Sequence, residues 1–258
     1  MTVDRTYNTK AVYINSVIPK THPRKASLEV RHKLIEGFEK GLVAQAGLIA
    51  QGRGEAFDYL IGEKTTKEAR KAEEAAIALL LSAKRPAISV NGNAAALCAR
   101  EIVKLAKKVN AKIEVNLFYR TAEREKKIAI FLKKHGAKKV YGLEKKHKIK
   151  NLSSERANVD DALWQADVVL VMLEDGDRTE ALKKAGKKVI AIDLNPMSRT
   201  AQKADITIVD NLVRAIPEMA KNAGKLKKAS NGKLMTKIRS FNNKKNLHLM
   251  EKLIRKKL

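Results

Sequence analysis

Residues 189–200 combine an apolar run with a carboxylate, an amide and an arginine, which are groups suited to binding a nucleotide. Asp193 and Asn195 follow the β-branched stretch 189–192, and Arg199 and Thr200 come shortly after a proline. A carboxylate binds ribose hydroxyls, an amide binds a base or a sugar, and an arginine binds phosphate. Backbone amides at the start of a helix also bind phosphate. The residue types and their spacing therefore predict a nucleotide site.

Three further apolar runs end in polar side chains. These are Asn91 after residues 87–90, Arg120 after 112–115, and Glu174, Asp175 and Arg178 after 167–173. In an open parallel sheet, ligands bind just outside the carboxyl ends of the strands. Four polar strand ends therefore predict one shared pocket, and its acidic part is the natural place for Mg²⁺. The alternatives are turn chemistry at Asn91 and a helix cap with Arg178 as its solvated neighbour.

The elements that position these residues alternate between short β-rich runs and helical patterns. This alternation predicts an α/β, Rossmann-like parallel sheet with right-handed crossovers and helices on both faces. The expected strands are 87–90, 112–115, 138–141, 167–173, 188–193 and 205–209. The expected helices between them are 94–109, 121–135, 178–185 and 211–223, with a short one near 160–164 in the long crossover 142–165.

The first 85 residues show no strand and predict an N-terminal helical layer, with helices at 27–50 and 65–83. This layer would be a lid, an oligomer contact or a cover on the sheet. Gly52 and Gly54 flank Arg53 and suit a tight turn that approaches an anion closely. They form no dinucleotide fingerprint, because Phe57 occupies the third glycine position, and the chain contains no phosphate-binding P-loop.

Three parts of the chain are expected. Residues 1–17 form an N-terminal extension, and residues 18–223 form a single α/β domain with a helical part (27–85) and a sheet-containing part (86–223). Residues 224–258 form a basic C-terminal tail with helices at 233–241 and 245–257.

Composition predicts a cytoplasmic globular protein. The chain has 258 residues and is 44% hydrophobic, but it lacks an apolar run long enough to span a bilayer and an apolar leader segment. Cys98 is the single cysteine, so no intrachain disulfide forms, and its apolar helical surroundings favour a small buried residue over a nucleophile. The scattered histidines argue against a zinc site.

The formal net charge of +26 raises nucleic acid as a possible partner. However, the lysines are spread over the predicted helix surfaces, and the aromatic residues that stack on bases make up only 4% of the chain. The charge therefore favours an ordinary lysine-rich surface, with nucleic acid only as a charge-driven secondary interaction.

Six segments together carry a resemblance to a known family. They are IPKTHPR (18–24), GLIAQGRGEAFDYL (47–60), SVNGN (89–93), EVNLFYRT (114–121), LEDGDRTEAL (173–182) and DLNPMSRT (193–200). In this order they resemble the archaeal 4-phosphopantoate–β-alanine ligases, also called phosphopantothenate synthetases. The resemblance extends from about residue 17 to residue 214, and the lysine-rich tail lies outside it.

The resemblance implies a homodimeric, cytosolic ligase of coenzyme A biosynthesis. The enzyme would join 4-phosphopantoate to β-alanine through an acyl-adenylate, convert ATP to AMP and pyrophosphate, and require Mg²⁺. The ATP contacts implied by the family fall on Arg31, Arg53, Asp193, Leu194, Asn195, Arg199, Thr200, Asn211 and Leu212. Candidates for substrate binding are His22, Arg24, Asn91, Arg120 and Arg178, and candidates for metal binding are Glu174 and Asp175.

Adenylation requires no protein nucleophile, and no catalytic base is assigned. ATP and phosphopantoate together bring about seven negative charges, so the pocket needs several cations, and catalysis would be mostly positioning and electrostatic stabilisation. Two alternatives remain open from the sequence: another ATP-dependent carboxylate–amine ligase, and a basic nucleic-acid-binding protein.

Overall fold

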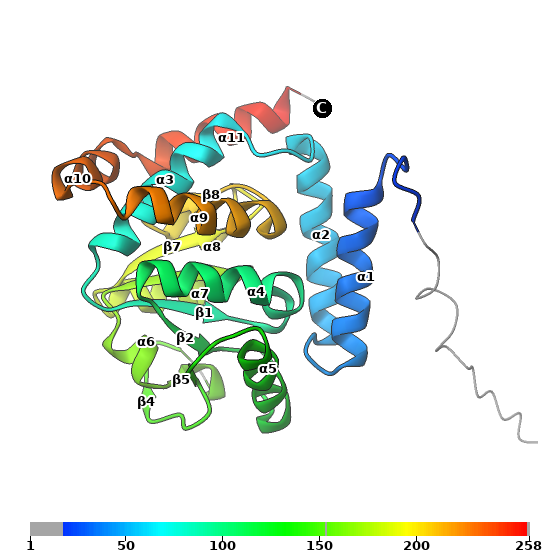
Figure 1. Cartoon of the computed structure of the whole chain (residues 1–258), viewed down its shortest axis with the longest axis vertical. Coiled ribbons are helices and arrows are strands. Elements are labelled where there is room, and N and C mark those ends of the chain that lie inside the picture. The colour runs from blue at the N-terminus through cyan, green and yellow to red at the C-terminus, as the bar shows by residue number, and fades with distance from the viewer. Residues whose placement is uncertain (1–17, 153, 257–258) are drawn as a thin grey trace, which may run out of the picture.

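The computed structural model describes residues 18–152 and 154–256. The predicted N-terminal extension 1–17 lies outside the described residues. Six parallel strands form one sheet in the order β3-β2-β1-β6-β7-β8, which confirms the predicted fold class (Figure 1). In that order their bounds are Val140–Tyr141, Lys112–Val115, Pro86–Val90, Val168–Met172, Lys188–Ile192 and Ile206–Ile208.

The strands are apolar on both faces because helices cover both. Ile88 and Leu170 pack toward α3, α4 and α9, whereas Ala87 and Val169 pack toward α6 and α7. This burial explains why the strands read as near-continuous apolar runs. The helices on the first face are α3 (Lys67–Ser82), α4 (Gly92–Val109), α5 (Ala122–Lys134) and α9 (Leu212–Leu226). Those on the second are α6 (Asp161–Gln165) and α7 (Gly176–Lys184).

Cys98 is buried in α4, as its apolar surroundings predict. Its backbone departs from helical geometry there, with φ −141° and ψ 25°. Its Sγ lies 3.6 Å from the carbonyl oxygen of Leu212, at the start of α9. The residue therefore sits at the packed contact between two core helices.

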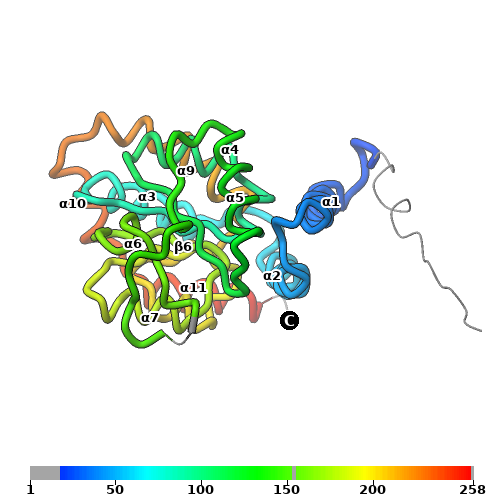
Figure 2. Tube along the Cα trace, turned by 90° about the horizontal axis from the view of Figure 1, so that it is seen from below, coloured from blue at the N-terminus to red at the C-terminus, as the bar shows by residue number. Residues whose placement is uncertain are grey.

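Two helices stand beside the sheet at the N-terminal end, where the sequence predicts one continuous helix over 27–50. That prediction is wrong, because α1 (Lys25–Glu39) ends before a connection in which Gly41 has φ 71° and Leu42 and Val43 are buried. The second helix, α2 (Gln45–Ile61), runs back alongside α1 (Figures 1 and 2).

The predicted tight turn at residues 52–54 is also wrong, since these residues lie inside α2. Each glycine costs a helix interior about 1 kcal/mol, and local sequence therefore argues against a helix here. Tertiary packing outweighs that local preference. Ile61 at the end of α2 is buried, and a Cβ at Gly54 would lie 3.5 Å from Cδ1 of Leu194. The helix thereby lies close against the loop after β7.

The two C-terminal helices pack on the body of the molecule. Their bounds are Asn231–Ser240 (α10) and Asn243–Arg255 (α11). Leu247, Met250 and Ile254 of α11 are buried in a cluster with Ile61 of α2, and α10 contacts α3. Helix α9 continues to Leu226, past the proposed start of the tail at 224, and that boundary stays a prediction.

The long crossover 142–165 contains elements that the sequence did not predict as well as the short helix that it did. β4 (His147–Lys148) pairs with β5 (Asn158–Val159) in an antiparallel hairpin, with the 3₁₀ helix η1 (Ser154–Ala157) between them. The predicted short helix is α6. Within the described part of the chain, no helix combines the length and the apolar character that crossing a membrane requires.

Candidate functional site

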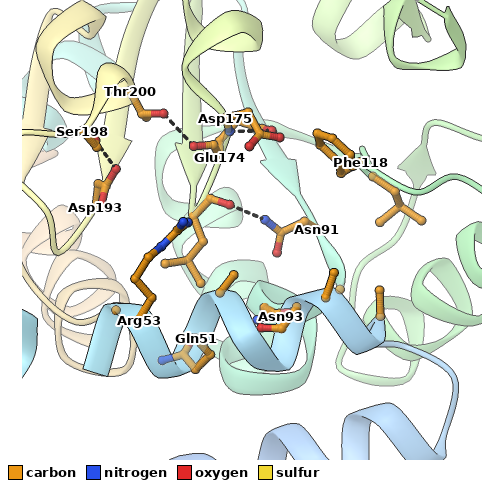
Figure 3. Close-up of a pocket in the computed structure, with 18 of the residues that line it drawn as sticks. Gln51, Arg53, Asn91, Asn93, Phe118, Glu174, Asp175, Asp193, Ser198 and Thr200 are labelled. Carbon is orange, nitrogen blue, oxygen red and sulfur yellow. Dashed lines mark hydrogen bonds between the residues drawn. The ribbon is translucent and has the colours of Figure 1, made fainter. Parts of the chain in front are cut away.

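A cavity of about 520 Å³ lies at the carboxyl edge of the sheet (Figure 3). Its walls come from the residues after β1, β2, β6 and β7, and α2 closes it from the side opposite the sheet. In the sheet, β2 and β3 lie on one side of β1, and β6, β7 and β8 lie on the other side. The strand order therefore reverses at β1, and the cavity spans this topological switch point. Ligands bind at such a point in open α/β folds.

The loop after β7 and the start of α8 (Arg199–Lys203) form one end of this cavity. Asp193 accepts a hydrogen bond from the backbone amide of Asn195 at 2.9 Å and another from the Ser198 hydroxyl. Burial raises the pKa of Asp193, while these hydrogen bonds and the Arg53 guanidinium oppose the shift. Thr200 donates to the Glu174 carbonyl oxygen at 2.6 Å and so ties the β7 loop to the β6 loop.

Two arginines from distant parts of the sequence line this same cavity. Arg53 projects from α2 toward the loops after β6 and β7, as Figure 3 shows. Arg199 belongs to α8, and its guanidinium pairs with Glu180 of α7 at 2.5 Å. The structure thus brings Arg53 and Arg199 to one cavity together with Asp193, Leu194, Asn195 and Thr200.

The acidic pair after β6 also lines the cavity. Glu174 lies 3.3 Å from Arg178, Asp175 lies 3.3 Å from Arg156, and burial raises the pKa of both carboxyls. Within residues 18–152 and 154–256, no group of three or more His, Cys, Asp or Glu side chains could hold a metal ion. Two carboxylates nevertheless fit Mg²⁺, which commonly takes one or two carboxylates and completes its shell with water and substrate phosphates.

Asn91 lies at the switch point and holds the two halves of the sheet edge together. Its side-chain oxygen caps α4 by accepting from Ala94 N at 2.9 Å, and its Nδ2 donates to the carbonyl oxygens of Met172 and Leu173. The side chain also lines the cavity. Turn chemistry and cavity position, which were alternatives from the sequence, therefore occur together.

Several predicted site residues do not line the cavity in this single chain. Arg24 and Arg31 pair with Glu55 across α1 and α2, at 3.5 and 2.8 Å, and His22 accepts from Arg24 N. Arg120 and Arg178 are almost fully buried behind the cavity wall. Asn211 caps α9 and donates to Asp58 at 2.8 Å, next to the buried Leu212.

The cavity also contains residues that were not among the candidates assigned to ATP, substrate or metal, although Asn93, Asn116 and Tyr119 lie at the polar strand ends that the sequence indicates. The additional residues are Gln51, Asn93, Asn116, Phe118, Tyr119 and Arg124. Asn116 carried a signal, because it follows a predicted strand. Arg124 carried none, since it falls inside a predicted helix among charged residues, where the pattern indicates a solvated face.

Gly176 sets the distance between α7 and Arg199. A Cβ at this position would lie 2.4 Å from both Cβ and Cγ of Arg199, which is closer than real Cβ contacts allow. We expect Gly176→Ala to displace α8 and to lower the rate of any reaction in this cavity by about 10- to 100-fold, since small misplacements of binding groups have effects of this size. Gly232→Ala, where nothing lies within 4 Å, is the matched control. Unchanged kinetics in both variants would show that α8 accommodates the methyl group.

Comparison with known proteins gives consistent matches. The model of one family, described as phosphopantothenate/pantothenate synthetase, matches residues 68–257. A Thermococcus onnurineus protein named 4-phosphopantoate–β-alanine ligase is 55% identical over 90% of this chain and 89% of its own length. Proteins of the same name from Thermococcus kodakarensis (53% identical, 92% and 94% covered) and Methanosarcina mazei (50%, 89% and 91%) are similarly close.

Proposed function

The chain belongs to the phosphopantothenate/pantothenate synthetase family, and on that premise we propose that it is the ATP-dependent ligase that joins 4-phosphopantoate to β-alanine in coenzyme A biosynthesis. The observation that carries this function is the identity of 50–55%, over about nine tenths of the chain, to proteins named for the reaction. The nucleic-acid-binding alternative is not favoured, because these relatives are named as ligases. We place the enzyme in the cytoplasm.

The reaction takes two steps. An oxygen of the acid's carboxylate forms a bond to the α-phosphorus of ATP, the bond from that phosphorus to the bridging oxygen breaks, and pyrophosphate leaves. The β-alanine amine then attacks the activated carbonyl carbon, AMP departs with the shared oxygen, and the nitrogen loses a proton. No covalent bond to the protein is needed, so the chain contributes by binding and by stabilising charge.

The geometry supports specific roles at the β7 end of the cavity. Arg53, Arg199 and the first amides of α8 would bind the phosphates of ATP. Asp193, held by Asn195 N and Ser198, would accept from the ribose hydroxyls. The implied contacts at Arg31, Asn211 and Leu212 lie elsewhere in the single chain and remain proposals.

Glu174 and Asp175 would hold Mg²⁺ when it is bound, where the ion would neutralise charge on the substrate phosphates. Without the ion, the nearby Arg156 and Arg178 balance these two carboxylates. We therefore expect the metal and the phosphates to be bound together rather than the metal alone.

We also propose that the enzyme is a homodimer formed through α1 and α2. Phe38, Ile49 and Tyr59 on these helices are exposed, and Ile49 retains 75% of its accessible surface. Arg24, just before α1, and Arg31, within α1, lie outside the chain's own cavity and pair with Glu55 of α2. Light scattering tests this proposal: a mass of one chain, 28.7 kDa, would contradict it.

The reaction itself is tested by pyrophosphate release from ATP. Product should form with 4-phosphopantoate and β-alanine together, and far less with pantoate or with other amino acids. Equal rates with another acid or amine would instead identify a different carboxylate–amine ligase. Failure of every acid to release pyrophosphate would refute the ligase function.

A further inference from the structure

Helix α2 closes the cavity on the side opposite the sheet, so much of it borders open space instead of a packed core. Gln51, Arg53 and Gly54 all line the cavity, and Arg53 projects toward the loops after β6 and β7 (Figure 3). Of the residues of α2, all of which the structure describes, only Ile61 is both apolar and buried. A helix with few buried apolar contacts is weakly held. Polar contacts therefore have a large share in setting where Arg53 lies.

One polar contact holds the start of α2. The side-chain nitrogen of Asn93, near the start of α4, donates to the carbonyl oxygen of Gly47 at 2.8 Å. A Cβ at Gly47 would lie 2.4 Å from Oδ1 of Asn93, so the two helices approach each other closely there. This contact precedes Arg53 in the helix, and the half of α2 that follows Arg53 is held separately.

Arg214 of α9 holds that second half through a buried carboxylate. Its Nη2 and Nη1 donate to the carboxylate of Asp58 in α2, at 2.5 and 3.1 Å. Its Nε and Nη2 also donate to Asp210, at 2.9 and 2.6 Å. Asp58 is 5% exposed and Asp210 is 1% exposed. Charged hydrogen bonds between such buried groups are strong, and the loss of one partner leaves the other charge uncompensated.

Neighbouring side chains complete this network. Asn211 donates to Oδ2 of Asp58 at 2.8 Å, and the Thr65 hydroxyl donates to Oδ2 of Asp210 at 2.6 Å. Helix formation does not explain the cation at position 214, because this residue lies in the first turn of α9, where the helix dipole disfavours a positive charge. The two carboxylates that Arg214 joins do explain it.

The link from Arg214 to the cavity is short. Asp58 follows Arg53 by five residues in the same helix, which is about 7.5 Å along the helix axis. A displacement of Asp58 relative to α9 therefore moves Arg53 as well. Arg214 itself does not line the cavity, so its effect on a ligand there is transmitted through α2.

We propose that Arg214 is a positioning residue for Arg53: by binding Asp58, it holds α2 at the distance from the sheet at which Arg53 meets the phosphates of ATP. The task given to Arg53 rests on the proposed function. The connection from Arg214 through Asp58 and α2 to the cavity wall rests on contacts within the chain.

Two variants break this connection. Arg214→Lys keeps a positive charge but lacks the planar fork that joins two carboxylates. Asp58→Asn removes the carboxylate on α2 and leaves Arg214 paired with Asp210. Each variant should lower the single-turnover rate of pyrophosphate release from ATP and 4-phosphopantoate by about 10- to 100-fold, since small misplacements of binding groups have effects of this size.

ATP binding gives an equilibrium readout of the same connection. The dissociation constant of ATP with Mg²⁺, measured by calorimetry, should rise by about tenfold in both variants, as expected when a charged hydrogen bond is weakened. Arg255→Lys makes the same change in an exposed arginine–carboxylate pair of α11. It is the matched control and should bind ATP and release pyrophosphate as wild type does.

A double-mutant cycle separates the positioning of Arg53 from a general loss of structure. In the Arg53→Gln background, Arg214→Lys should weaken ATP binding by less than about threefold further, because the side chain that it positions is already absent. If Arg214 only stabilises the fold, its effect per folded molecule is either absent or equal in the two backgrounds. Either of these outcomes would overturn the positioning role.

Amide hydrogen exchange tests the same role without measuring activity. In Arg214→Lys and Asp58→Asn, the amides of α2 should exchange about tenfold faster, while those of β6 and β7 should exchange as in wild type. Faster exchange throughout the sheet would reveal a global loss of stability. Unchanged exchange in α2 would show that Arg214 does not hold this helix. Each of these two results contradicts the proposal.

The same measurements distinguish this role from the proposed reaction. If wild type binds ATP but releases no pyrophosphate with any acid, and the cycle still couples Arg214 to Arg53, the reaction is wrong and the positioning role stands. If wild type is active while Arg214→Lys and Asp58→Asn have normal rates and normal ATP binding, the reaction is correct and the positioning role is wrong.

Discussion

Replacing Arg53 by glutamine is expected to lower the rate of adenylate formation by about 100- to 1000-fold, the usual cost of removing a donor that stabilises developing charge. Arg53 projects into the cavity from α2, and its guanidinium opposes the rise in pKa that burial causes at Asp175 and Asp193. Glutamine keeps the length and polarity of the side chain in part but removes the charge that the α-phosphate requires during attack.

Adenylate formation is measured as pyrophosphate released in a single turnover without β-alanine. Arg53→Lys should retain more activity than Arg53→Gln but less than wild type, because an ammonium group cannot form a bidentate pair with phosphate. Arg100→Gln, on the exposed surface of α4, removes the same charge away from the cavity and is the matched control. A loss of less than tenfold in Arg53→Gln would exclude this arginine from the reaction.

Replacing Glu73 by glutamine is expected to stabilise the protein in alkaline solution. Glu73 of α3 is buried, and its Oε1 has no hydrogen-bond partner. Burial, with Asp210 and Glu218 of the neighbouring segment, raises its pKa to about 8, and Arg70 only partly opposes this. The folded state therefore holds a proton that the unfolded chain releases near its usual pKa.

The sign of the pH dependence follows from this difference. The contribution of Glu73 to stability is complete below about pH 4.5 and is lost as the pH rises to about 8. At pH 8.5 wild type should be less stable than Glu73→Gln by on the order of 3 kcal/mol, and at pH 5 the two should be similar. Urea unfolding at both pH values measures this.

Glu74→Gln is the control for the Glu73 prediction, because Glu74 is exposed and pairs with Lys237 at 2.6 Å. Its free energy of unfolding should change with pH in the same way as that of wild type. The same pH dependence for Glu73→Gln would mean that Glu73 is ionised in the folded protein across this range.

Much of the sheet and one end of the cavity could be predicted from the sequence. Parallel strands covered on both faces must be apolar along their whole length, so runs such as 188–193 and 167–173 locate β7 and β6 to within a residue at each end. The polar residues after them necessarily meet at one edge. Asp193 and Glu174 were therefore identifiable before their surroundings were known.

Other features depend on contacts that local sequence does not encode. The glycines at 52 and 54 argue against a helix, and only the packing of α2 against Leu194 and α11 explains why one forms. Arg124 and Arg178 have the same charge and similar helical contexts. One lines the cavity and the other is buried behind Asn116, because the crossover after β3 covers the second.

The burial of Cys98 between α4 and α9 has a practical consequence. Desolvation raises the pKa of its thiol to about 12, and the reactive thiolate is therefore almost absent at neutral pH. Maleimide dyes should leave Cys98 unmodified, so a cysteine introduced elsewhere can be labelled without first replacing Cys98. A thiol introduced on the solvent side of α1 would then carry the single fluorophore, and its emission would test whether the surroundings of this helix change when ATP binds.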